Sequence, residues 1–466
     1  MEQQYNLVVI GAGPGGYVAA IKAAQLGMKV AVVENREVGG TCLNRGCIPT
    51  KTLMHSAHLY HEVKNFEAVG LKVEGLSYDI KKIHERKEEV VDKLRTGISQ
   101  LFKANKIDFI SGTATITDKN TILVQKDEEK TEVKTEKILI ATGSKPAKPP
   151  IEGLTLPNVV TSDEMLSMSD KVYNKLLIIG GGVIGVEFAT VYNSLGCEVV
   201  IVEAMDRILP TMDKEISQSM AMSLKKKGIK IHTSAMVEKI SEENGLTCYY
   251  TEKGKAQTET ADGILVSIGR RANTENLFAD GFDIEMERGC VVVNEKFQTS
   301  VEGIYAIGDV IKGIQLAHVA SAEGIVAVEN MVGKEPSIDL NVVPSCIYTN
   351  PEISAVGITA DEAKAKGIKV KTGKFIMSAN GKSLIAMDER GFIKVVFDEE
   401  TDVILGAQLM CARATDLISE FTTAIVNKLT SEQLSSVIRP HPTYVEAVTE
   451  AIESANGCSI HTAPRK

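Results

Sequence analysis

The stretch Val8-Val9-Ile10-Gly11-Ala12-Gly13-Pro14-Gly15-Gly16 decides the fold of this chain. An apolar strand, Asn6 to Ile10, leads into a turn of glycines, and a helical stretch follows to Leu26. A second apolar strand, Lys29 to Val33, then ends at Glu34. A strand, a glycine turn, a helix and a strand with an acidic residue about 20 positions on form a dinucleotide-binding unit.

The residues of this unit have separate tasks. Gly11 permits the tight turn, Gly13 lets the backbone approach a pyrophosphate, and Gly16 lets the helix pack closely on the strand. The N–H groups at the start of the helix face the phosphates, and Glu34 is placed to accept hydrogen bonds from a ribose diol. The sequence therefore predicts a bound dinucleotide.

The same unit occurs a second time, with its marker residues displaced by a constant 169 positions. Strands 176–179 and 198–202 flank a helix at 187–195, and the markers are Gly180, Gly182, Gly185 and Glu203. Two such units imply two nucleotides in one enzyme. The alternative is one functional site beside a decayed copy, although neither copy has lost a glycine or its acid.

Two cysteines stand in Gly39-Gly40-Thr41-Cys42-Leu43-Asn44-Arg45-Gly46-Cys47-Ile48-Pro49-Thr50-Lys51. The run from Ile48 to Val63 predicts a helix, and Pro49 suits its first turn. Cys47 would lie at the positive end of the helix dipole, which favours its thiolate. Cys42 is near enough for a disulfide, provided that the two Cα atoms come within about 7 Å.

Two other interpretations of these cysteines stay open at this point. They could be structural thiols without a shared role. They could also bind zinc with His55, His58 and His61 of the same helix, although a Cys-x4-Cys arm is looser than a usual zinc knuckle.

Composition indicates an ordinary globular protein. The 466 residues suggest about three domains, and contents of 44% hydrophobic and 24% charged residues are usual for this class. A net charge of -9 without a basic tract argues against a nucleic-acid surface. No apolar run approaches the roughly 18 residues of a membrane-spanning helix. No signal or transit peptide is expected before the first strand, so we expect a cytoplasmic protein, with a mature form inside an organelle as the alternative.

Eight cysteines in so long a chain do not form a disulfide scaffold, and cytosolic disulfides are usually catalytic or redox-sensing. This favours chemistry at Cys42 and Cys47. We expect the other six to be inert, since they lack a partner at useful spacing: Cys197, Cys248, Cys290, Cys346, Cys411 and Cys458.

The rest of the chain predicts more strands and a third domain. Between the units we expect a charged helical excursion, a β-meander, a buried strand and a proline-rich linker: residues 66–106, 106–137, 138–144 and 145–157. Asp309 follows another strand, where it could contact a cofactor polyol or cap a helix beginning near Leu316. From about Val342, strands at 369–378, 391–398 and 403–410 with two helices predict an α+β domain.

Together these parts resemble the flavin-dependent pyridine nucleotide–disulfide oxidoreductases. The resemblance rests on the two dinucleotide units, the segment GGTCLNRGCIPTK, and a C-terminal His441-Pro442 followed by Glu446. It covers essentially the whole chain in order and removes most weight from the zinc and inert-thiol interpretations. Within the family, the chain is most similar to the branch that reoxidises protein-bound dihydrolipoamide.

The resemblance implies an α/β fold of two Rossmann-like dinucleotide-binding domains and a C-terminal α+β dimerisation domain. The expected parts are an FAD-binding domain at 1–146, an NAD-binding domain at 147–271, a central segment completing the FAD site at 272–341, and an interface domain at 342–466.

It also implies which residues hold the cofactors. FAD would be held by Gly11, Gly13, Gly16, Glu34, Thr142, Gly143 and Asp309, with Ala317 and His318 near the flavin ring. NAD would be held by Gly180, Gly182, Gly185, Glu203, Gly269 and Arg270. No metal is expected.

The catalytic roles follow from the same resemblance. Cys47 would lie against the flavin, and Cys42 would exchange with the substrate. Lys51 matches a lysine near flavin N5, with Glu187 as its ion-pair partner. His441 would be the acid–base catalyst, and Glu446 would orient it.

The function implied is reoxidation of dihydrolipoamide through the Cys42–Cys47 disulfide and FAD, with a hydride passed to NAD+. The expected partners are a second copy, forming a homodimer, and a lipoyl-bearing protein of a 2-oxo acid dehydrogenase or glycine-cleavage system, with no nucleic acid and no membrane. The alternatives are another NAD(P)H-dependent disulfide reductase of this fold and, from a different class, a non-catalytic zinc-stabilised nucleotide-binding protein.

Two positions depart from the family pattern. Arg45 stands where valine is common, and it could favour a thiolate, help an acidic partner dock, or point to solvent. Arg439-Pro440 replaces the His-Ala that often precedes the catalytic histidine, so the family pattern does not predict the geometry of this loop.

Overall fold

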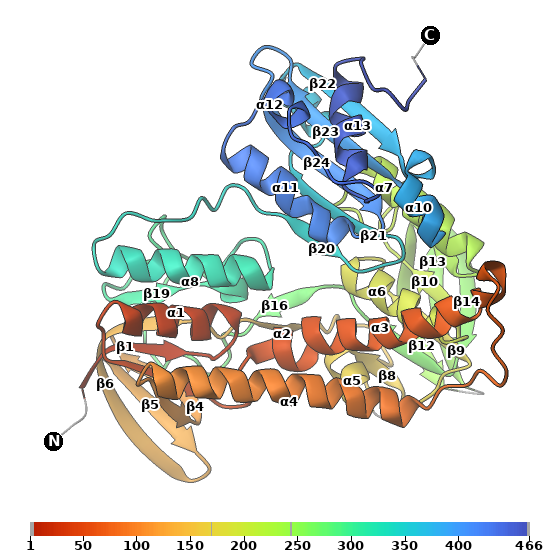
Figure 1. Cartoon of the computed structure of the whole chain (residues 1–466). Coiled ribbons are helices and arrows are strands. Elements are labelled where there is room, and N and C mark those ends of the chain that lie inside the picture. The colour runs from red at the N-terminus through yellow and green to blue at the C-terminus, as the bar shows by residue number, and fades with distance from the viewer. Residues whose placement is uncertain (1–3, 169, 243–244, 464–466) are drawn as a thin grey trace. The chain divides into compact units, whose positions relative to one another are not determined.

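The computed structural model describes residues 4–168, 170–242 and 245–463, and Figure 1 shows their helices and strands. The chain divides into two compact units. The first comprises Met1–Pro150, Leu154–Tyr173 and Leu265–Leu340, and the second comprises Ile151–Gly153, Asn174–Ile264 and Asn341–Lys466.

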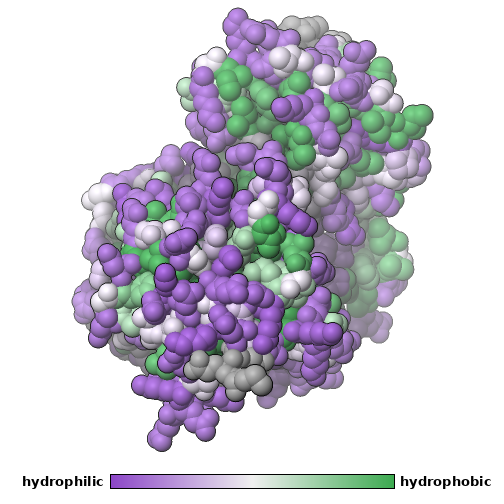
Figure 2. Space-filling view, turned by 90° about the vertical axis from the view of Figure 1, so that its left-hand side faces the viewer, coloured by the Kyte–Doolittle hydropathy of each residue, from purple (hydrophilic) through white to green (hydrophobic). Residues whose placement is uncertain are grey.

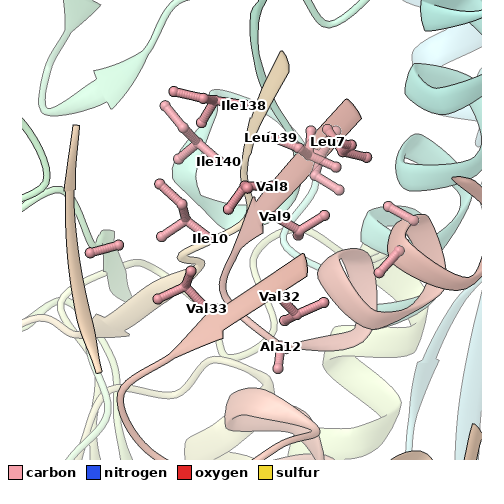
Figure 3. Close-up of a cluster of buried hydrophobic side chains, with 14 of the residues drawn as sticks. Leu7, Val8, Val9, Ile10, Ala12, Val32, Val33, Ile138, Leu139 and Ile140 are labelled. Carbon is pink, nitrogen blue, oxygen red and sulfur yellow. The ribbon is translucent and has the colours of Figure 1, made fainter. Parts of the chain in front are cut away.

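The first unit is built on a seven-stranded sheet with the order β3-β2-β1-β6-β5-β4, in which β19 also pairs with β6. The parallel strands are β1 (Gln4–Ile10), β2 (Val30–Glu34), β3 (Asp108–Ser111), β6 (Glu129–Ile140) and β19 (Ile304–Ala306). An antiparallel extension is formed by β4 (Thr113–Asp118) and β5 (Thr121–Lys126). Figure 3 shows the apolar side chains of β1, β2 and β6 that form the buried core, as both faces of a parallel sheet require.

Two helices of the first unit cross at very close range. They are α1 (Pro14–Gln25) and α8 (Ala317–Met331), which lie side by side in Figure 1. A Cβ on Gly15 would lie 3.0 Å from the carbonyl oxygen of Ala320, and one on Gly324 would lie 2.8 Å from that of Gly15. Glycine at both positions therefore permits the crossing.

The remaining elements of the first unit are mostly short. The helices are α2 (Gly40–Arg45), α3 (Cys47–Val63), α4 (Ile80–Ala104) and α5 (Ser162–Ser167), with 3-10 turns η1 (Phe66–Val69) and η2 (Gly308–Val310). The strands are β7 (Ser144–Pro146), β8 (Val159–Thr161), β16 (Arg270–Ala272), β17 (Met286–Glu287) and β18 (Cys290–Val291). The helix predicted at 48–63 is α3, whereas α2 was not predicted.

The second unit holds the repeated dinucleotide fold. Its parallel strands are β11 (Lys230–His232), β10 (Glu198–Val202) and β9 (Lys175–Ile179), and β15 (Gly263–Val266) follows β9 in the strand order of this sheet. The helices are α6 (Val183–Ser194) and α7 (Lys214–Lys226), and an antiparallel meander is formed by β12 (Ala235–Glu242), β13 (Leu246–Glu252) and β14 (Lys255–Ala261).

The C-terminal part of the second unit is a five-stranded antiparallel sheet with the order β20-β21-β24-β23-β22. The strands are β20 (Ser345–Ile347), β21 (Glu352–Gly357), β22 (Val370–Ile376), β23 (Phe392–Asp398) and β24 (Ile404–Cys411). The helices are α9 (Ala360–Ala365), α10 (Gly381–Ala386), α11 (Ala414–Val426), α12 (Ser431–Ser435) and α13 (Glu446–Ala455), with the 3-10 turn η3 (Met377–Ala379).

The predicted α/β class with two dinucleotide folds and a C-terminal α+β region is confirmed. The three strands predicted after residue 342 are β22, β23 and β24. The prediction of two helices there was wrong, because three more helices of five or six residues are too short to show a helical period.

Candidate functional site

The glycine turn of the first unit is held by its own acidic residue. Gly11 has a φ of 105°, and a Cβ on Gly16 would lie 1.9 Å from the carbonyl oxygen of Gly11. The Glu34 carboxylate accepts hydrogen bonds from the N–H of Ala12 at 2.9 Å and of Arg36 at 2.8 Å. The carboxylate at the end of β2 is thus fixed against the turn before α1.

The second unit repeats this arrangement atom for atom. Gly180 has a φ of 107°, and the Glu203 carboxylate accepts hydrogen bonds from the N–H of Gly181 and, at 2.7 Å, of Met205. These partners are displaced from Ala12 and Arg36 by the same 169 positions as the glycines. In both copies the acidic residue therefore accepts the same two backbone hydrogen bonds, which favours two intact nucleotide sites.

The cysteine segment rests directly on the first glycine turn. The N–H of Gly39 donates to the carbonyl oxygen of Ala12 at 2.8 Å. Gly40 has a φ of 58°, and a Cβ there would lie 2.5 Å from the Cα of Gly13. The two glycines of this segment let its backbone touch the turn, so α2 begins where the first dinucleotide is expected.

Cys42 lies in α2, and Cys47 is the first residue of α3. Both are present as thiols and are partly buried. The pKa of Cys42 is raised because its thiol hydrogen-bonds with Cys47 and is desolvated, while the positive charge of Lys51 acts in the opposite direction. The structure thus brings the two predicted cysteines together beside a lysine, as a dithiol–disulfide pair requires.

Arg45 does not point to solvent. Its side chain is 13% exposed and forms an ion pair with Glu37. Although burial raises the pKa of Glu37, the Arg45 charge and hydrogen bond lower it overall. Arg95 of α4 also donates to the Asn44 side chain at 2.9 and 3.0 Å, so the last two residues of α2 are both held by side-chain contacts.

Three of the other six cysteines are buried and have the character of structural thiols. Burial raises the pKa of Cys197, Cys248 and Cys411 to about 12. Among the described residues, no group of three or more His, Cys, Asp and Glu side chains could hold a metal ion. His58, one of the zinc candidates, pairs with Glu62 at 3.0 Å.

Asp309 does not cap the helix that follows it. Helix α8 begins at Ala317 without a side-chain cap, and the Asp309 carboxylate accepts a hydrogen bond from the Ser144 hydroxyl at 2.6 Å. Arg270 donates to the same hydroxyl and to the Ser144 carbonyl oxygen, each at 2.8 Å. Sequence analysis missed Ser144, which joins two of the predicted cofactor-binding residues.

A buried carboxyl group, that of Glu323, lies next to the turn that carries Asp309. Glu323 of α8 accepts a hydrogen bond from the N–H of Gly308 at 2.7 Å. Burial, with a further contribution from the charge of Asp309, raises the pKa of Glu323 to about 7. Ala317 and His318 occupy the first turn of the same helix.

His441 and Glu446 form the predicted pair in the second unit. The His441 Nδ1 lies 2.7 Å from a Glu446 carboxylate oxygen, and the N–H of Thr443 donates to the other oxygen at 2.8 Å. Burial raises the pKa of Glu446, but these hydrogen bonds outweigh it and lower the pKa overall. With Nδ1 committed to the carboxylate, Nε2 is the atom left for proton transfer.

Lys51 and Glu187 lie in different units. Lys51 is in α3, and buried Glu187 of α6 accepts a hydrogen bond from the N–H of Tyr348 at 3.0 Å. The ion pair expected between them stays a prediction, and so does a coenzyme contact by Gly269 or Arg270.

The sequence profile described as "Pyridine nucleotide-disulphide oxidoreductase" matches residues 5–324, and the dimerisation domain of the same family matches residues 343–452. The chain belongs to the pyridine nucleotide-disulphide oxidoreductase family. Members use FAD and NAD(H), so the predictions of a flavoprotein oxidoreductase and of these two cofactors are confirmed, and the non-catalytic alternative is set aside.

Several relatives in this family are named dihydrolipoyl dehydrogenase. One from Bacillus subtilis (strain 168) is 44% identical over 474 residues, which cover 99% of this chain and 100% of that protein. One from Geobacillus stearothermophilus is 40% identical and covers 97% of each chain. The predicted family and branch are thereby confirmed.

Solved structures of the family share the fold. The HOCl-induced flavoprotein disulfide reductase RclA from Escherichia coli has a TM-score of 0.86 and 31% identity, covering 96% of this chain and 99% of that chain. LpdA from Mycobacterium tuberculosis has a TM-score of 0.89 and 25% identity over the same shares. In the part of the chain that the structure describes, no helix has the length and apolarity needed to cross a membrane.

The residues of the first unit fit FAD, the flavin cofactor of this family. The Thr142 hydroxyl is buried and has no hydrogen-bond partner among the described atoms, as expected of a group that awaits a ligand. Gly143 follows it with a φ of 66°, and Gly11 and Gly16 leave no space for side chains in the turn.

Proposed function

We propose that this chain is a dihydrolipoyl dehydrogenase that reoxidises dihydrolipoamide carried by a lipoyl-bearing protein. The observation that carries the proposal is the contact between the Cys42 thiol of α2, a helix whose start abuts the first glycine turn, and the Cys47 thiol at the start of α3. The relatives named dihydrolipoyl dehydrogenase, at 39–44% identity over nearly the whole chain, support this substrate over others in the family.

His441 would begin the reaction by accepting a proton at Nε2 from a substrate thiol, because the thiolate is the nucleophile. The thiolate attacks Cys42 Sγ of the Cys42–Cys47 disulfide, and Cys47 leaves as a thiolate. The second substrate thiol then attacks the mixed disulfide and passes its proton to the departing Cys42 sulfur, which releases lipoamide and leaves Cys42 as a thiol. His441 releases the first proton to solvent, and the cysteine pair has gained the two electrons lost by the substrate.

The chemistry that bound FAD would supply is acceptance of these two electrons and hydride transfer to NAD+. The first unit would hold FAD through the turn at Gly11, Gly13 and Gly16, the Glu34 carboxylate, Thr142 and Asp309. Lys51 would place its positive charge beside the Cys42–Cys47 pair, where it favours thiolate. The second unit would bind NAD+ with Glu203 on the adenosine ribose.

The active site would be completed by a second copy of the chain. His441 is 77% exposed, and nearby Ile438 and Val437 are exposed by 96% and 49%. Figure 2 shows hydrophobic side chains in patches on an otherwise hydrophilic face. A dimerisation domain that leaves its histidine and neighbouring apolar side chains uncovered supports a two-fold interface that seals them.

The partner would be the lipoyl-bearing protein of a 2-oxo acid dehydrogenase or glycine-cleavage system. The cytoplasmic location stays a prediction. The purified protein should be yellow and reduce NAD+ with dihydrolipoamide. It should reduce glutathione disulfide with NADPH far more slowly. The reverse preference would replace the proposal with the alternative of another NAD(P)H-dependent disulfide reductase.

A further inference from the structure

The loop between α12 and α13 presents His441, and a buried arginine holds this loop at its start. Arg439 stands two residues before His441, and its side chain is only 4% exposed. A guanidinium group carries five N–H donors in a rigid plane, so it can join several elements at once.

The guanidinium of Arg439 contacts three helices. It forms an ion pair with Glu420 of α11, in which Nε donates at 3.1 Å and Nη2 also donates. Nη1 donates to the Thr449 hydroxyl of α13 at 2.8 Å and to the carbonyl oxygens of Leu434 in α12 and Val437, each at 3.3 Å. The charge is therefore buried, paired and hydrogen-bonded, as a stable buried cation requires.

Two of these attachments lie on the helix that orients the histidine. Thr449 follows Glu446 by three residues in α13, so both side chains face the same side of that helix. The loop thus contacts α13 through Arg439 to Thr449, and through both His441 and the Thr443 N–H to Glu446. Pro440 joins the two contacts with a fixed φ, which limits how far His441 can move when Arg439 is held.

The far side of the loop is fastened separately. The Thr443 hydroxyl donates to the carbonyl oxygen of Pro440 at 2.6 Å, and Asn380 donates to the carbonyl oxygen of Thr443 at 3.0 Å. These bonds restrain the backbone after His441, but neither reaches α11 or α13. Among the hydrogen bonds of the described residues, those of the Arg439 guanidinium join the segment before His441 to these two helices.

We propose that Arg439 is a positioning residue, which fixes the His441 loop on α13 so that Nδ1 stays bonded to Glu446 and Nε2 stays aimed at the substrate thiol. This inference rests on the proposed function, because it assigns His441 the proton transfer. It explains how a loop without the usual His-Ala keeps its geometry: the guanidinium supplies contacts to α11, α12 and α13 from one side chain.

The test compares Arg439→Gln with Arg439→Lys, Arg439→His and Thr449→Val, using the FAD-loaded full chain. The matched control is Arg413→Gln, since Arg413 is 68% exposed and its ion pair with Asp416 spans 3.9 Å. Two rates are measured for each variant. One is the steady-state oxidation of dihydrolipoamide by NAD+, which needs His441, and the other is electron transfer from NADH to ferricyanide, which does not.

Arg439→Gln should lower kcat for dihydrolipoamide about 10- to 100-fold, the loss expected when a catalytic group moves by about 1 Å. Its KM for NAD+ and its ferricyanide rate should stay within about twofold of wild type. Lysine keeps the charge but not the planar set of donors, so Arg439→Lys should have a kcat for dihydrolipoamide close to that of Arg439→Gln. Arg439→His tests whether the family's usual residue restores this kcat. Stopped-flow reduction by dihydrolipoamide should slow by the same factor, and reduction by NADH should not.

The outcomes separate the inference from the function on which it rests. A wild-type enzyme that does not oxidise dihydrolipoamide would refute the proposed function itself. With wild type active, an unchanged kcat in Arg439→Gln, or equal losses in both assays, overturns the positioning role. If Arg439→Gln does not fold, Thr449→Val decides: it keeps the Glu420 pair and should slow dihydrolipoamide oxidation alone, and no slowing there also overturns the role.

Discussion

Replacing Glu203 with glutamine should weaken NAD+ binding without affecting the flavin site. The Glu203 carboxylate is 8% exposed and accepts hydrogen bonds from the N–H groups of Gly181 and Met205. Glutamine offers one oxygen, so one N–H group loses its acceptor, and an unsatisfied buried donor costs about 1–3 kcal/mol. Because Gly181 belongs to the turn that would receive the coenzyme pyrophosphate, we expect the KM for NAD+ to rise about 10- to 100-fold, since each 1.4 kcal/mol is tenfold.

The same change should relax the choice of coenzyme. A carboxylate at this position accepts hydrogen bonds from a 2′-hydroxyl and repels a 2′-phosphate, so the wild-type enzyme should prefer NAD+ to NADP+. Glu203→Gln removes the repulsion and should reduce this preference at least tenfold. Glu34→Gln is a matched control, because Glu34 makes the same two backbone contacts in the first unit. That variant should lose FAD more readily and keep its coenzyme preference.

Steady-state kcat/KM values for NAD+ and NADP+, measured at saturating dihydrolipoamide, test these expectations. FAD content, read from the flavin absorbance after dialysis, separates the two sites. Equal kcat/KM for both coenzymes in wild type would refute the reasoning, and so would an unchanged ratio in Glu203→Gln.

Three further predictions follow from the site. Cys42→Ser should show a long-wavelength charge-transfer absorbance from the Cys47 thiolate against flavin, and Cys47→Ser should lack it; full dihydrolipoamide activity in either variant contradicts the redox roles. Burial raises the pKa of Glu323 to about 7, so the folded state keeps a proton that the unfolded state loses above about pH 4.5, and stability should fall by roughly 2.5 kcal/mol as the pH rises from 5 to 8. In urea unfolding, Glu323→Gln should lose this fall, and an undiminished fall would argue against the assignment. Inactive Cys42→Ser and His441→Gln homodimers, dissociated and mixed, should regain about half of the wild-type activity per hybrid dimer if the site is shared, because one of its two sites is then intact; a verified hybrid without activity would rule that out.

The two nucleotide-binding units could be predicted from the sequence because the geometry of each turn requires glycines at a fixed spacing within a few residues. A side chain on Gly16 would meet the Gly11 carbonyl oxygen five residues away, so the spacing itself reports the geometry. The cysteine segment was equally visible, but helix α2 within it was not, since its six residues begin with a glycine, follow another and show no apolar period.

Contacts between distant residues were the part that sequence analysis could not supply. Ser144 joins Asp309 and Arg270, which lie more than 120 positions along the chain. Arg439 looked like a departure from a pattern, and only the folded chain shows that Glu420 and Thr449 meet its guanidinium. Such partners depend on how strands and helices pack, and neither propensity nor periodicity reports that packing.

The cysteine segment rests on the turn that would cradle the flavin pyrophosphate, with the Gly39 N–H on the Ala12 carbonyl oxygen and Gly40 against Gly13. Flavin affinity and the reduction potential of the Cys42–Cys47 pair therefore belong to one thermodynamic cycle. If closing the disulfide changes FAD affinity by some factor, bound FAD must change the dithiol–disulfide equilibrium by the same factor. A tenfold effect on affinity would appear as a shift of about 30 mV in that two-electron couple.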